Sequence, residues 1–156
     1  LYLLSTRAKT LLVQVTSFTV AHSITLGLGL YGVVSIPPAI VEPLIAASIV
    51  FVAVENLITD KLTPWRTYVV FCFGLIHGLG FAGVLHEIGL AKSDFINGLI
   101  AFNVGVEFGQ LAVILGAFLA VGCWFRNRIW YRARVVRPAS VIIALIGVFW
   151  MVERIN

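Results

Sequence analysis

Five long apolar runs dominate this sequence and limit what it can fold into. They cover approximately residues 10–31, 39–58, 65–85, 96–124 and 139–152. A helix needs about 20 mostly apolar residues to cross a hydrocarbon core of about 30 Å, and there it satisfies its own backbone hydrogen bonds. Only 12% of the residues are charged, against about 25% in a typical soluble domain. We therefore predict an all-α integral membrane protein, a polytopic bundle of about five transmembrane helices.

The breaks between these runs are short. Gly32 and Pro37 fall in the first break, and the basic run 126–137 separates the last two apolar runs. No linker or low-complexity tract divides the chain, so we predict a single transmembrane domain over residues 1–156. Because the chain begins at Leu1 rather than at methionine, we interpret it as the remainder of a longer or processed precursor.

Lysine and arginine are divided unevenly between the two ends of such a bundle. Nine lie on one side, and two, Lys92 and Arg154, lie on the other. Short loops rich in these residues stay in the cytoplasm, which places Leu1 inside and Asn156 outside. We expect the protein in a bacterial inner membrane. The nine residues are Arg7, Lys9, Lys61, Arg66, Arg126, Arg128, Arg132, Arg134 and Arg137.

The net charge of +4 follows from this loop asymmetry. The basic run 126–137 also lies beside Trp124, Trp130 and Tyr131, the residue types of an interfacial belt. Anionic lipid is therefore the expected contact of this run. The lipid bilayer, and no nucleic acid, is the partner that the charge pattern favours.

Four ionisable residues lie inside the apolar runs, where a charged group costs about 2.5 to 3.5 kcal/mol at a helix centre. They are His22, Glu55, His77 and Glu107, each from a different predicted helix. At about 1.5 Å of rise per residue, both histidines lie about 18 Å deep and Glu107 lies near the midplane, whereas Glu55 lies somewhat toward the cytoplasm. We expect these four groups to line a polar interior.

The neighbours of these four residues are also polar. Asn103, Glu107 and Gln110 follow the i, i+4, i+7 spacing that places them on one helix face. Ser23 and Asn56 directly follow two of the four ionisable residues. Around a bound ion, such side chains could hold the ligands in orientation.

Pairs of glycines accompany two of the ionisable residues. Gly74 and Gly78 flank His77, and Gly105 and Gly109 flank Glu107. Small residues spaced by four let transmembrane helices approach closely. We therefore predict close helix packing at both pairs.

Two short patterns recur along the chain. FTVAH at 18–22 matches FGLIH at 73–77, and VAVE at 52–55 matches VGVE at 104–107. Order and direction are preserved, as they are in parallel transporter repeats. These matches are consistent with a parallel two-helix repeat, although patterns this short also arise by chance in apolar sequence.

Two imidazoles and two carboxylates suit a borderline divalent ion such as Ni²⁺, Co²⁺ or Zn²⁺ better than Cu⁺, which prefers sulfur ligands. His22, Glu55, His77 and Glu107 are thus candidate metal ligands. The alternative is purely structural. In that case the histidines hydrogen-bond one helix to another, with protonated glutamates as partners.

A second polar group is expected near the outer surface. It consists of Glu42, His86 and Glu87, at the ends of the second and third predicted helices. These residues could gather cations in an outer vestibule. Helix ends are also where charged residues ordinarily lie.

Four ordered blocks of this sequence resemble the HupE/UreJ family of membrane proteins. The blocks are FTVAHSITL (18–26), EPLIAASIVFVAVEN (42–56), FGLIHGLGFAGVL (73–85) and FNVGVEFGQLAV (102–113). The family's histidine and glutamate motifs fall on His22, Glu55, His77 and Glu107. Members usually carry an earlier helix with a Gly-x-Asp-His motif, so the resemblance implies an upstream helix before Leu1.

The resemblance implies metal handling linked to hydrogenase or urease systems. The leading hypothesis is a permease for a divalent transition metal, with nickel favoured and cobalt or zinc as further possibilities. One alternative is a metal-dependent membrane hydrolase, although no HExxH motif occurs. Another is an accessory subunit that binds a membrane partner chain or a second copy of itself, with haem ligation by His22 and His77 as a variant. A transporter or accessory protein is favoured over an enzyme.

Overall fold

A computed structural model describes residues 8–59, 65–87, 95–125, 128 and 130–155 of the chain, and the regular structure within these ranges is helical. Five stretches are long and apolar enough to cross a membrane. The prediction of an all-α bundle with five membrane-spanning helices is confirmed. The helices are α1 (Ala8–Leu30), α2 (Pro38–Ile58), α3 (Arg66–Glu87), α4 (Phe95–Ala117), η2 (Phe118–Gly122), α5 (Cys123–Phe125), η3 (Arg132–Val136) and α6 (Arg137–Ile155).

The helix ends follow local backbone chemistry. Gly32, with a positive φ of 71°, lies in the turn after α1, where glycine carries no steric penalty. Pro38 opens α2, where its missing N–H costs no helical hydrogen bond. The expectation that the basic run 126–137 separates two spans is wrong in part, because Arg132–Val136 is a π-helix that continues directly into α6. Arginines on a helix end can reach the interface, so charge alone does not mark a loop.

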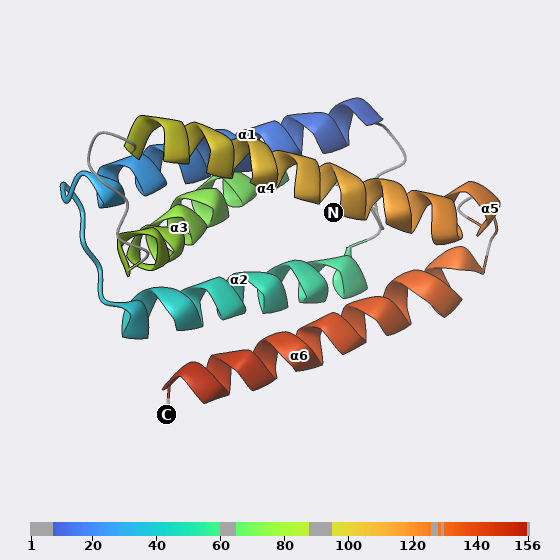
Figure 1. Ribbon diagram of the computed structural model, residues 1–156. Coiled ribbons are helices and arrows are strands. Elements are labelled where there is room, and N and C mark those ends of the chain that lie inside the picture. Colours follow the sequence, from blue (N-terminus) through green and yellow to red (C-terminus); the bar gives the residue numbers. More distant parts are fainter. Residues whose placement is uncertain (1–7, 60–64, 88–94, 126–127, 129, 156) are drawn as a thin grey trace.

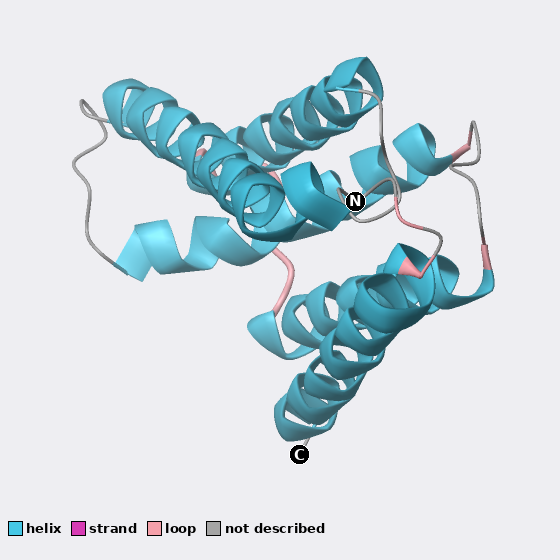
Figure 2. Cartoon of the chain, turned by 90° about the vertical axis from the view of Figure 1, so that its right-hand side faces the viewer, coloured by secondary structure: helices cyan, strands magenta, loops and turns pink. Residues whose placement is uncertain are grey.

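The helices pack in the order α4, α1, α3, α2, α6, as Figure 1 shows. The most extensive packing joins α1 with α3, and α2 with α6. In the turned view of Figure 2, the pair that contains the C-terminal helix lies apart from the other spans. Large apolar side chains cover much of the outer surface, including Phe108, Leu145 and Phe149. A lipid-facing surface explains this exposure, which would be unusual in water.

Two glycines allow α1 and α3 to approach closely. A Cβ atom added to Gly74 would lie 2.6 Å from the Phe18 carbonyl oxygen, and one added to Gly78 would collide with the His22 carbonyl. The close packing predicted at this pair is confirmed. A step of four residues on α3 is matched by a step of four on α1, so the two helices run parallel and in register. His22 and His77 therefore lie at one level, as expected from their depth.

The second glycine pair behaves differently. A Cβ atom added to Gly105 or Gly109 would meet no atom within 4 Å among the described residues. The prediction of close packing at this pair is therefore wrong for the described part of the chain. Both glycines lie on the exposed side of α4, because α4 packs against α1 through Leu99 and Asn103. When a helix is apolar on all sides, its sequence does not indicate which side packs against a neighbouring helix.

The helix contacts agree with the predicted two-helix repeat. α1 lies along α3, while α2 packs against α3 and α4 packs against α1. If α3 and α4 repeat α1 and α2, the contact between α2 and α3 corresponds to the contact between α4 and α1. In the α1–α3 packing, Gly74 meets Phe18 and Gly78 meets His22, a register within one residue of the offset between the matching patterns at 18–22 and 73–77.

Candidate functional site

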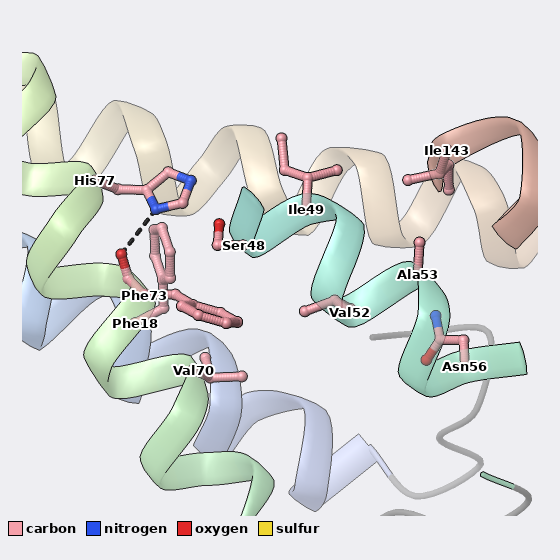
Figure 3. A pocket seen from close by; sticks show the side chains of 10 residues that line it. All are labelled: Phe18, Ser48, Ile49, Val52, Ala53, Asn56, Val70, Phe73, His77 and Ile143. Carbon is pink, nitrogen blue, oxygen red and sulfur yellow. Dashed lines mark hydrogen bonds between the residues drawn. The ribbon is translucent and has the colours of Figure 1, made fainter. Parts of the chain in front are cut away.

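A cavity of about 270 Å³ lies between α2 and α3, with further walls from α1 and α6. Most of its lining is aliphatic or aromatic, and its polar lining residues are Ser48, Asn56 and His77. Figure 3 shows His77 at one end of this lining and Asn56 toward the other. An apolar hollow with a few convergent polar groups is the usual form of a small-ligand site.

The His77 ring is held in one orientation. Its Nδ1 lies 2.7 Å from the Phe73 carbonyl oxygen. Because a carbonyl only accepts, Nδ1 carries the proton and Nε2 keeps its lone pair. Figure 3 shows the second ring nitrogen pointing away from α3, on the side of α2. Histidines that bind metals commonly donate their other N–H to a backbone carbonyl in this way.

Glu55 lies near one end of the cavity and forms a buried ion pair. Its carboxylate lies 3.3 Å from Nη1 of Arg66, and both side chains are almost fully buried. Arg66 also donates from Nη2 to Oδ1 of Asn56 at 3.0 Å. Arg132 donates to the Thr59 carbonyl oxygen at 2.9 Å, which fastens η3 to the end of α2. We call this end of the bundle, which holds Arg66 and Arg132, the basic end.

His22 lies at the same level as His77 but in different surroundings. Its ring stacks between Phe18 and Phe102, with centroid distances of 5.9 and 6.0 Å, and Phe81 meets it edge-on. The Phe18 ring also touches His77, at 5.2 Å, so an aromatic ring separates the two imidazoles. His22 is 1% exposed, and neither ring nitrogen has a hydrogen-bond partner among the described residues.

The polar face of α4 lies against α1. Ser23 Oγ lies 2.7 Å from Oδ1 of Asn103, and Leu99 lies beside Gly27. Since the two helices are antiparallel, Glu107 comes level with Thr19, one turn nearer the basic end. Glu107 and Gln110 are half-buried. The predicted polar face therefore packs toward α1 rather than toward the cavity that holds His77.

A second cavity, of about 280 Å³, opens at the end opposite the basic end. Its lining includes Glu42, which forms an ion pair with Arg154 of α6. Ile49 lines both cavities, so the two adjoin at this residue. Of the predicted outer group, only the Glu42 side chain is described. His86 and Glu87 belong to the last turn of α3, but their side chains lie outside the described part of the structure.

A comparison with protein families decides the relationship. The model of the family described as HupE / UreJ protein matches residues 1–154. The chain belongs to the HupE/UreJ family. This family is linked to nickel or cobalt transport and to accessory functions of urease and hydrogenase systems. Searches of curated proteins and of solved structures found no match.

In this HupE/UreJ protein the four candidate ligands are not gathered at one point. Among the described residues, no group of three or more His, Cys, Asp or Glu side chains is placed to hold a metal ion. His77 faces the cavity, Glu55 lies by its basic end, and His22 is enclosed by aromatic rings. Glu107 lies on the α4 face that packs toward α1.

Sequence reasoning missed two residues of these sites. Arg66 was treated only as an interfacial charge, and Arg154 only as an outer charge. A signal existed for Arg66, because a buried glutamate close to the end of an apolar run requires a cation nearby. The next cations along the chain are Lys61 and Arg66.

Proposed function

We propose that this protein is a membrane permease for a divalent transition metal, and that the ion passes between α2 and α3 through the cavity that holds His77. The orientation of His77 carries this proposal. The Phe73 carbonyl fixes the Nδ1 proton, which leaves Nε2 as a ligand on the cavity side. Membership of a metal-handling family supports the same function.

The donors along this cavity suit an ion in transit. A neutral imidazole binds Ni²⁺, Co²⁺ and Zn²⁺ well, whereas the Ser48 hydroxyl and the Asn56 amide are weak oxygen donors. Conduction requires that an ion bind strongly enough to enter and weakly enough to leave. Nickel is the favoured ion because of the family's link to urease and hydrogenase systems, with cobalt and zinc as alternatives.

The proposed path joins the two adjoining cavities. An ion enters beside Glu42, passes Ile49, meets His77 and leaves past Asn56 and Glu55. We assign the basic end to the cytoplasm, in a bacterial inner membrane, because short loops rich in Lys and Arg stay on that side.

His22 and Glu107 stay candidate ligands in this proposal. The ring nitrogens of His22 are buried and lack a hydrogen-bond partner among the described residues, and such groups are costly to leave unsatisfied. Rotation of the Phe18 ring would bring His22 into contact with the cavity. Glu107 lies on the α4 face that packs toward α1, so it would reach the cavity only after these helices rearrange.

Uptake of radiolabelled Ni²⁺ by proteoliposomes tests this proposal. The full-length protein should accumulate nickel above the level of protein-free vesicles. His77→Gln should lower the initial rate at least about tenfold, because it removes the only imidazole among the described residues that line the cavity. Cys72→Ala on the exposed side of α3 is the matched control and should leave the rate unchanged. Equal uptake by wild type and His77→Gln would contradict the proposed path.

A further inference from the structure

Arg66 occupies the basic end of the proposed path. Its side chain is 1% exposed, and among the described residues it makes polar contacts with the Glu55 carboxylate and the Asn56 amide. Asn56 also lines the cavity that holds His77. The guanidinium group therefore binds the same two side chains that an ion leaving this cavity would meet.

The charge of Arg66 makes this arrangement unfavourable for a passing cation. A guanidinium group stays protonated at any physiological pH. A second one, from Arg132, reaches the backbone of Thr59 close by. An ion approaching Glu55 thus meets a positive charge that already occupies the carboxylate.

A gain in folding stability does not explain well why Glu55 and Arg66 form a buried ion pair. Removing two charged groups from water is costly, and a buried ion pair is often no more stabilising than apolar residues of the same size. The pair does place a guanidinium group on a carboxylate beside the cavity, where a metal cation would also bind. A guanidinium fork and a metal ion compete for the same carboxylate oxygens.

We propose that Arg66 is a built-in competitor for Glu55. An arriving divalent ion displaces the guanidinium group from Glu55 and Asn56, and Arg66 returns when the ion leaves. Arg66 therefore weakens nickel binding at this end and promotes release. The inference rests on the proposed permease function and adds a positioning residue to its path.

Equilibrium binding of radiolabelled Ni²⁺ to the purified full-length protein tests this role. Arg66→Gln should bind nickel about tenfold more tightly than wild type, a change that corresponds to about 1.4 kcal/mol. Arg66→Lys keeps the charge but loses the fork that joins Glu55 to Asn56, so its affinity should lie between the two. A merely structural role predicts weaker binding in both variants.

A double-mutant cycle separates competition from indirect effects. In a Glu55→Gln background the tightening caused by Arg66→Gln should disappear, since the contested carboxylate is gone. Tightening that persists without Glu55 would overturn the proposal. Arg66→Lys keeps the test decisive if Arg66→Gln fails to fold, because unchanged or weaker binding by Arg66→Lys also overturns it.

The two proposals can fail separately. If wild type binds nickel and neither Arg66 variant binds it more tightly, only the competitor role falls. If neither wild type nor the variants bind nickel, both the competitor role and the permease proposal are contradicted.

Discussion

His22 and His77 show how far one residue type can differ at one level of a bundle. The Nδ1–H of His77 donates a hydrogen bond to a carbonyl of its own helix, and Nε2 lies on the cavity side. His22 is enclosed by Phe18, Phe81 and Phe102. Depth along a helix follows from counting residues, so the shared level could be predicted. The direction of each ring depends on packing partners from other helices, which the sequence does not specify.

Arg66 illustrates a second limit at this scale. Its position near the start of an apolar run indicates an interfacial cation, and such residues commonly extend into the headgroup region. In the structure it turns inward to Glu55 and Asn56 instead. The requirement of Glu55 for a counter-charge could be predicted, but the choice between Arg66 and Lys61 could not.

The bond between Ser23 and Asn103 gives a prediction at the residue scale. Ser23→Ala removes the hydrogen bond that joins α1 to α4. Hydrogen bonds between transmembrane helices contribute about 0.6 kcal/mol on average and up to about 1.7 kcal/mol. We expect a loss of unfolding free energy in this range, measured in lipid bicelles. Ser35→Ala, at an exposed position between α1 and α2, is the control, and an equal loss in both variants would argue against the bond.

At the scale of the elements, the helices were predictable because hydrophobic length is read directly from the sequence. When η2 and α5 are counted with α4 as one span, the bounds of α1, α2, α3, this span and α6 differ from the predicted ranges by no more than three residues. The exception is the segment Arg132–Val136, whose arginines resemble a loop in composition yet continue the last span. The sequence was less informative about which face of each helix packs against its neighbours. The Gly74 and Gly78 prediction was correct and the Gly105 and Gly109 prediction was wrong, although both pairs have the same spacing.

The two glycine pairs provide a matched prediction. Gly78→Val would push a side chain into the backbone of α1, whereas Gly105→Val would add one to an open face. Both changes alter helix propensity equally, so their difference reports packing. Gly78→Val should lose at least about 2 kcal/mol more unfolding free energy than Gly105→Val, as overpacking costs suggest. Reversible unfolding in mixed micelles measures this, and similar losses would contradict the close α1–α3 contact.

At the scale of the whole molecule, the order of the helices controls which polar groups meet. α3 lies between α1 and α2, so its two sides face different neighbours. This places His77 on the cavity with α2 and leaves α4 on the far side of α1. The repeat at 18–22 and 73–77 relates α1 to α3 but does not predict that they pack together, and no pattern in the sequence indicated that α6 packs on α2. For this reason the depth of the four candidate ligands could be predicted from the sequence, whereas their separation from one another in the bundle could not.

The central claim is that His77 coordinates the transported ion inside the cavity between α2 and α3. X-ray absorption at the nickel edge, recorded on the nickel-loaded full-length protein, tests it most directly. The account predicts scattering from an imidazole ligand in wild type, and loss of that scattering in His77→Gln with the Cys72→Ala control unchanged. An imidazole signal that survives His77→Gln at full strength would contradict the account.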